Sequence, residues 1–188
     1  MVEAFWARLS TVANDLPGYD LECVFVNDGS RDETGSALSA LAQRDPRARV
    51  VTLSRNFGHQ RAIMAGLDFC SGDYIVIMDA DLQDPPELLA DILLRLEKDA
   101  DLVHMVRASR RVDPWMKRTT AGLFYRLMRR FALPELPENA GDFKGFNRCV
   151  LDALRKYPER VIFMRGMLAT LGFRQATIPY PRAARSAG

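Results

Sequence analysis

The sequence predicts an α/β fold with a largely parallel β-sheet flanked by helices. Two observations support this expectation. Short apolar runs alternate with segments of helical periodicity throughout residues 1–106, and polar, turn-forming residues directly follow three of these runs. This alternation is typical of parallel sheets, because the chain usually returns between parallel strands through a helix. The length of 188 residues suits a single domain.

The expected elements follow from the period of the apolar residues. A first helix is expected over residues 2–16, with one apolar stripe formed by Phe5, Leu9, Val12 and Leu16. Strands are expected over the apolar runs at residues 21–26, 50–53, 74–78 and 102–106. Helices are expected between them at residues 32–43, 59–70 and 85–97, the last beginning at Pro85. The run 74–78 shows no polar alternation, which predicts burial on both faces, as in a parallel sheet.

The pattern changes after residue 106. Residues 107–114 are polar and basic, and residues 115–131 predict an amphipathic helix with basic side chains. The rest of the chain predicts a loop at 133–141, a short strand or loop at Phe143, helices at 148–156 and 163–171, and a strand at 176–180.

Charge divides the chain into an acidic and a basic part. Residues 1–100 hold 17 acidic and 9 basic side chains, a net charge of −8, whereas residues 101–188 hold 7 acidic and 17 basic ones, a net charge of +10. An acidic part can hold a cation, and a basic part can face phosphate or an anionic membrane surface. Solvated helix faces are the alternative explanation. The basic part carries no recognisable nucleic-acid-binding motif, so no nucleic-acid partner is expected.

Cysteine usage and hydropathy exclude two further classes of protein. Cys23, Cys70 and Cys149 lie far apart in the sequence and are expected to be buried, reduced thiols. No apolar run approaches the ~18 residues that a membrane span requires. The start of the chain lacks the basic-then-apolar pattern of a secretory signal. The chain as given is therefore expected not to cross a membrane.

Two carboxylates leave the end of a predicted strand together. These are Asp79 and Asp81, and Gln83 adds a neutral oxygen two residues further on. Ligands of open α/β sheets sit beyond the carboxyl ends of the strands. Mg²⁺ is usually bound by one or two carboxylates together with substrate phosphates, so these residues are candidate ligands of a divalent cation that neutralises a departing diphosphate. Solvation of a strand end is the alternative for an isolated Asp-X-Asp.

The loops after two other strands also carry polar residues. Asp28 can accept hydrogen bonds from a nucleobase or a ribose, and Gly29 lets the backbone turn closely past a ligand. Ser30 or Asp32 could equally cap the following helix. Arg55 precedes a helix start, where backbone N–H groups favour anions, and is a candidate contact for a diphosphate.

Four strings resemble the family 2 glycosyltransferases, which adopt the GT-A fold. They are residues 26–34 (Val-Asn-Asp-Gly-Ser-Arg-Asp-Glu-Thr), 54–60 (Ser-Arg-Asn-Phe-Gly-His-Gln), 79–87 (Asp-Ala-Asp-Leu-Gln-Asp-Pro-Pro-Glu) and 141–144 (Gly-Asp-Phe-Lys). Residues 163–166 and 185–188 are also similar to family segments, so the resemblance covers nearly the whole chain in the right order. Within the family, the chain is most similar to the polyprenyl-phosphate glycosyltransferases, in particular the bactoprenol glucosyltransferases.

The resemblance implies a reaction and a set of roles. A hexose, glucose or mannose, would pass with inversion from a nucleotide-diphosphate sugar of the UDP-glucose or GDP-mannose type to a lipid phosphate, with Mg²⁺ or Mn²⁺ as cofactor. Asp28, with Gly29 and Arg55, would bind the nucleotide sugar. Asp79 and Asp81 would be catalytic and, with Gln83, would form the metal and diphosphate site. The candidates for holding the acceptor phosphate are Arg118, Lys144 and Arg165.

The resemblance also implies an organisation for the single domain over residues 1–188. Residues 1–106 would bind the nucleotide sugar, and residues 107–188 would face the acceptor. The basic amphipathic helix at 115–131 would lie in the membrane interface at the cytoplasmic face. A core-packed helix with a wet basic face is the alternative. A homo-oligomer is left open.

The sequence departs from the family pattern at three places. The chain begins in the helix that follows the family's first strand, which carries a Pro-X-Tyr-Asn-Glu motif, and it ends before the family's usual membrane-facing segment. Asn27 stands where Asp is usual, and Lys144 stands where Arg is usual. We therefore expect weak or no transferase activity from this chain alone. A non-catalytic remnant that binds a membrane or partner through residues 115–131 is the alternative function, and an Asp-X-Asp phosphatase is a weaker one.

Overall fold

A computed structural model describes residues 1–108, 140–156 and 164–181. The first half of the chain alternates helices and strands. Its elements are α1 (Val2–Asn14), β1 (Cys23–Asn27), α2 (Thr34–Arg44), β2 (Ala48–Thr52), α3 (His59–Phe69), β3 (Tyr74–Ile77), the 3₁₀ turn η1 (Pro86–Leu88), α4 (Leu89–Lys98) and β4 (Leu102–Arg107). The remaining described elements are β5 (Ala140–Asn147), α6 (Arg148–Arg155), α7 (Met164–Thr170) and β6 (Gln175–Tyr180). The helices and strands predicted within these ranges are confirmed, with ends that differ by a few residues.

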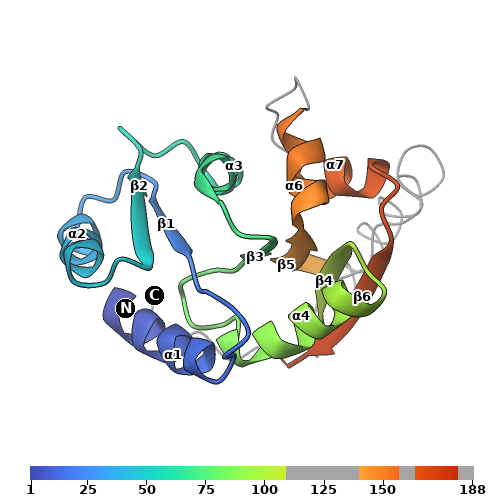
Figure 1. The fold of residues 1–188 in the computed structure, drawn as a ribbon. Helices are drawn as coiled ribbons and strands as arrows, with labels where there is room; N and C mark the ends of the chain where they lie inside the picture. Colours follow the sequence, from blue (N-terminus) through green and yellow to red (C-terminus); the bar gives the residue numbers. More distant parts are fainter. Residues whose placement is uncertain (109–139, 157–163, 182–188) are drawn as a thin grey trace, which may run out of the picture.

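The strands form two separate sheets among the described residues. β1 and β2 pair in parallel, with Cys23 opposite Ala48 and Asn27 opposite Thr52. The other four strands lie in the order β3-β5-β4-β6. Figure 1 shows the β1–β2 pair with α1 and α2 on one side of the molecule, and the four-stranded sheet with α4, α6 and α7 on the other. Helix α3 lies between these two parts.

The predicted α/β class with parallel strand pairing and flanking helices is confirmed, but the strand directions are mixed and the strands do not form one sheet. β4 and β6 pair in parallel, but β5 runs antiparallel to both β3 and β4. The sequence predicted only a short strand or loop at Phe143, whereas β5 is eight residues long and lies inside the four-stranded sheet. The predicted loop at 133–141 therefore overlaps the beginning of this strand. In β3 only Ile75 is buried; Ile75 and Ile77 pack into the cluster of α6 and α7, and Val76 packs into the cluster of α4, so the two faces of β3 are packed by helices.

Three apolar clusters hold these layers together. The first joins α1 and α2 to the β1–β2 pair, through side chains that include Phe5, Trp6 and Phe25. The second packs α6 and α7 against one face of the four-stranded sheet, and the third packs α4 against its other face. Phe5 and Trp6 meet Phe25 edge to face, with ring centroids 6.0 and 6.1 Å apart, a geometry that aromatic pairs prefer.

Helix α4 approaches β5 at a glycine. A Cβ atom at Gly145 would lie 2.3 Å from Cγ2 of Ile92, which is too close for any larger side chain. Ile92 is completely buried in the cluster between α4 and the sheet. This close contact holds α4 against the sheet. It thereby also positions Leu89, where α4 begins directly after residues 79–88.

Candidate active site

The loops after β1 and β2 pack tightly against each other. The Asp28 carboxylate accepts hydrogen bonds from the backbone N–H groups of Phe57 and Gly58, at 2.7 and 2.9 Å. Gly29 has φ +69°, and a Cβ atom there would lie 2.4 Å from the carbonyl carbon of Arg55. The sequence predicted these residues as nucleotide-sugar ligands. The structure adds that Asp28 and Gly29 also hold the second loop in place.

Arg55 belongs to the second of these loops, between β2 and α3. Its guanidinium stacks over the Phe57 ring, 4.3 Å from the ring centroid. Arg55 lines a cavity of about 390 Å³ together with residues of the first loop, including Asn27, Gly29 and Arg31. Because Arg55 is exposed, this cation–π contact favours that position of the guanidinium by about 0.5–1 kcal/mol. The structure thus brings Arg55 close to Gly29 but into a different cavity from the strand-end carboxylates.

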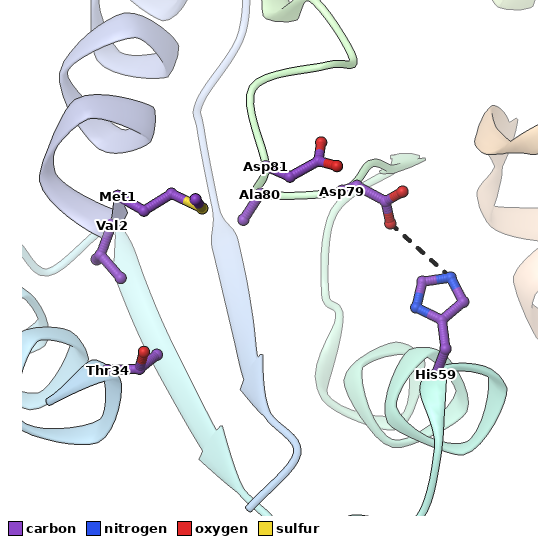
Figure 2. Close-up of a pocket in the computed structure, with 7 residues that line it drawn as sticks. All are labelled: Met1, Val2, Thr34, His59, Asp79, Ala80 and Asp81. Carbon is purple, nitrogen blue, oxygen red and sulfur yellow. Dashed lines mark ion pairs between the residues drawn. The ribbon is translucent and has the colours of Figure 1, made fainter. Parts of the chain in front are cut away.

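Asp79 and Asp81 line a second cavity, which measures about 530 Å³. The other lining residues are Met1, Val2, Thr34, His59 and Ala80 (Figure 2). Figure 2 shows Asp79 and Asp81 on the segment after β3. Asp79 points toward His59, and Met1 lies on the opposite side of the cavity. The carboxylates that the sequence predicted as metal ligands and catalytic residues therefore face an open space that can admit a ligand.

A row of charged and polar side chains continues from Asp79 across to β5. Nε2 of His59 lies 3.8 Å from Oδ1 of Asp79 and 3.1 Å from Oδ2 of Asp142. Oδ1 of Asp142 in turn lies 3.9 Å from Nζ of Lys144. Neither His59 nor Asp142 was among the site residues predicted from the sequence. The only sequence signal for Asp142 was its place in the Gly-Asp-Phe-Lys string.

The loop from Asp79 to Asp84 is ordered by its own side chains. Oδ1 of Asp81 accepts the backbone N–H of Gln83 at 3.0 Å, and Oδ2 of Asp84 accepts the backbone N–H of Asp79 at 3.3 Å. Leu82 has φ +63°, a region that residues other than glycine rarely adopt. Oδ1 of Asp84 accepts a hydrogen bond from the Tyr180 hydroxyl at 2.8 Å. Burial, and then this contact with Asp84, raises the pKa of Tyr180 to about 12.

The two carboxylates suit a cation that is shared with a substrate. Within residues 1–108, 140–156 and 164–181, no group of three or more His, Cys, Asp or Glu side chains is arranged to hold a metal ion by itself. Mg²⁺ is usually bound through one or two carboxylates, water and substrate phosphates rather than in an all-protein cage. Asp79 and Asp81 beside an open cavity fit that mode. Gln83 is not among the residues that line the cavity; its backbone N–H supports Asp81 instead.

The predicted acceptor-phosphate residues lie in three different situations. Arg118, with the whole predicted helix at 115–131, lies outside the described residues. Lys144 is completely buried in β5, beside Asp142. Arg165 belongs to α7, and its side chain lies outside the described part of the structure. In the described ranges, no helix has both the length and the apolar character needed to cross a membrane.

Sequence comparison decides the family. The glycosyl transferase family 2 profile matches residues 3–155. The chain belongs to this family. This family 2 chain is 41% identical over 174 residues to a bactoprenol glucosyl transferase of Shigella phage SfV, covering 93% of the chain and 57% of the relative. It is 40% identical over all 188 residues to the Bacillus subtilis glycosyltransferase YkcC, of which it covers 58%. The family 2 chain thus spans little more than half the length of the curated relatives it matches.

Solved structures support the fold. The family 2 chain superposes on TarS of S. aureus, residues 1–349, with a TM-score of 0.56 and 18% identity, over 93% of this chain and 55% of that one. It superposes on the mannosyltransferase PcManGT of Pyrobaculum calidifontis, solved with GDP-Man and Mn²⁺, with a TM-score of 0.54 and 22% identity, over 92% and 51% of the two chains. The fold is of the GT-A type that the sequence motifs implied, with the strand directions described above.

Proposed function

We propose that this chain is the nucleotide-sugar-binding part of a glycosyltransferase that moves a hexose onto a polyprenyl phosphate. The observation that carries the proposal is the cavity of about 530 Å³ with Asp79 and Asp81 on its wall, placed directly after β3 in a family 2 chain. The bactoprenol glucosyl transferases at 41% identity support the choice of a lipid phosphate as acceptor. The donor is a nucleotide-diphosphate sugar of the UDP-glucose or GDP-mannose type.

Charge neutralisation is the main chemical task in this reaction. The diphosphate departs with negative charge, and a bound Mg²⁺ or Mn²⁺ would stabilise that charge as a Lewis acid. Asp79 and Asp81 are the residues that would hold the cation. A lipid phosphate is already anionic near neutral pH, so its oxygen attacks the anomeric carbon and inverts it without a strong protein base. Positioning and electrostatic stabilisation then supply most of the rate enhancement.

The two other loops would hold the nucleotide. Asp28 and Gly29 lie at the carboxyl end of β1, where α/β sheets bind ligands. Asp28 fixes the backbone N–H groups of Phe57 and Gly58, just before α3 begins at His59. A fixed helix start suits an anionic group of the donor. Arg118 and Arg165 are proposed to hold the acceptor phosphate, with the buried Lys144 placed behind Asp142 rather than in contact with the phosphate.

Calorimetric titration tests this proposal. UDP, UDP-glucose and GDP-mannose are titrated into the 188-residue chain with Mn²⁺ and again with EDTA. We expect metal-dependent binding that Asp81→Ala abolishes. Asp73→Ala is the matched control, because Asp73 is an exposed aspartate just before the opposite end of β3 and does not line the cavity. No binding of any nucleotide under any metal condition would refute the proposal.

The acceptor would bring the protein to a membrane surface. We propose peripheral contact with the cytoplasmic face through the basic part of the chain, residues 101–188, whose net charge is +10. Lys and Arg side chains are attracted to anionic lipids, and salt weakens that attraction. Sedimentation with vesicles that contain phosphatidylserine should therefore retain the chain at low salt and release it at high salt. Equal retention on neutral vesicles would contradict the electrostatic part of this proposal.

A further inference from the structure

The loop that carries Asp79 and Asp81 is tied to a distant strand by one buried carboxylate. Asp84 is only 2% exposed, and its two oxygens have separate partners. Oδ2 accepts the backbone N–H of Asp79, and Oδ1 accepts the hydroxyl of Tyr180. The same side chain thus contacts the first residue of the candidate metal loop and a residue 96 positions away in the sequence.

Tyr180 is a rigid anchor for that carboxylate. It is the last residue of β6, is 1% exposed, and pairs in register with Arg107 at the end of β4. Its ring meets Phe143 of β5 edge to face, at 5.4 Å between centroids and an interplanar angle of 90°. Because β3 and β6 are the two edges of the four-stranded sheet, the Tyr180–Asp84 bond connects the loop after one edge strand to the end of the other.

The loop needs such an anchor because the local sequence does not favour its backbone conformation. Leu82 has φ +63° between the two ends of the loop. A leucine holds this backbone region only where the surroundings determine it, and such residues are frequent at ligand sites. The Asp79 and Asp84 ends are joined by the bond from the Asp79 N–H to Oδ2 of Asp84, which closes the loop around Leu82.

We propose that Asp84, held by Tyr180, is a positioning residue that sets the backbone of Asp79 and thereby the placement of the Asp79 and Asp81 carboxylates for a divalent cation and a diphosphate. Asp84 acts through the loop, since it is buried and does not line the cavity. This inference rests on the proposed function, because it concerns the same site.

The test compares two tyrosine hydroxyls that bond to carboxylates. Tyr180→Phe removes the hydroxyl that holds Asp84 and leaves the ring against Phe143. Tyr19→Phe is the matched control, since the Tyr19 hydroxyl bonds Oε1 of Glu97 at 2.5 Å and Tyr19 does not line the cavity. UDP is titrated calorimetrically into each full 188-residue chain with Mn²⁺ and with EDTA, and thermal unfolding is recorded in parallel.

We expect Tyr180→Phe to weaken Mn²⁺-dependent UDP binding roughly threefold to tenfold, the range for loss of one orienting hydrogen bond. Tyr19→Phe should leave the affinity within about twofold, and the two variants should not differ in EDTA. Loss of folded protein alone would lower the binding stoichiometry and leave the dissociation constant unchanged. Amide exchange at Asp79 should accelerate in Tyr180→Phe, which reports the loosened loop without any ligand.

A second variant keeps the test decisive. Asp84→Leu keeps a side chain of similar size that accepts no hydrogen bond, so neither the Asp79 N–H nor the Tyr180 hydroxyl keeps this acceptor, and it should weaken the metal-dependent binding at least as much as Tyr180→Phe. Metal-dependent UDP binding that both variants leave unchanged would overturn this inference and leave the proposed function intact. Absence of metal-dependent nucleotide binding in the unsubstituted chain would overturn both.

Discussion

Replacement of Gly29 by alanine tests how the first two loops of the site are held together. The new Cβ atom would lie 2.4 Å from the carbonyl carbon of Arg55 and 2.6 Å from the backbone nitrogen of Asn56. Both neighbours are backbone atoms and cannot rotate away. Gly29 also has φ +69°, where an alanine is strained.

Two costs therefore add at this position. Left-handed backbone costs an alanine about 1–2 kcal/mol, and inserting a methyl group into a packed contact costs about 1–3 kcal/mol. Gly172→Ala separates them, because Gly172 has the same φ of +69° with no atom within 4 Å of its Cβ position. We expect Gly29→Ala to lower the free energy of unfolding by about 3 kcal/mol and Gly172→Ala by about 1 kcal/mol.

Urea denaturation of the two variants measures this difference. The excess for Gly29→Ala, about 2 kcal/mol, reports the contact between the loops after β1 and β2. Since that contact also holds the Phe57 and Gly58 N–H groups on Asp28, nucleotide binding should weaken in Gly29→Ala and not in Gly172→Ala. Equal losses of stability in the two variants would refute the reasoning.

Two further predictions concern stability. The Arg174 guanidinium, through its hydrogen bonds, lowers the pKa of Asp101 from 3.8 to about 2. A lowered pKa in the folded state stabilises the protein above about pH 4, and that contribution is lost as the pH falls toward 2. Arg174→Ala should therefore show a shallower loss of unfolding free energy between pH 4 and pH 2, measured by urea denaturation, and an unchanged slope would contradict this. Gly145→Ala should destabilise the fold by about 1–3 kcal/mol through its clash with Ile92. Gly145→Ala combined with Ile92→Ala should lose less than the sum of the single losses, whereas strict additivity would show that the two side chains do not meet.

Periodicity alone was enough to place most of the elements in the described ranges. The stripe through Phe5 and Leu9 correctly predicted α1, and the apolar run at 74–78 correctly predicted β3. The strand β5 was largely missed. Its sequence, Ala-Gly-Asp-Phe-Lys-Gly-Phe-Asn, contains two glycines and two charged residues, which are depleted in strands. Burial between β3 and β4 overrides that local preference.

The residues of the candidate site also fall into those that the sequence could predict and those that it could not. Asp28, Asp79 and Asp81 could be proposed as site residues because each lies within three residues of the end of an apolar run, where α/β sheets bind ligands. Asp84 and Asp142 were not predictable as parts of the site. Asp84 lay inside a recognised string without a role. Asp142 reaches His59, 83 positions away, only in the tertiary structure, whereas Lys144 is its neighbour along β5.

The sequence by itself determined the α/β class, the family motifs and the positions of the strand-end carboxylates, because all of these depend on residues within a few positions of one another. The tertiary structure alone decided that β5 runs antiparallel between β3 and β4, and that Tyr180 holds Asp84 across 96 positions. Strand direction and such long-range bonds depend on which surfaces are buried together. Which surfaces pack together depends on the whole fold, and the periodicity of one segment does not reveal which segment packs against it.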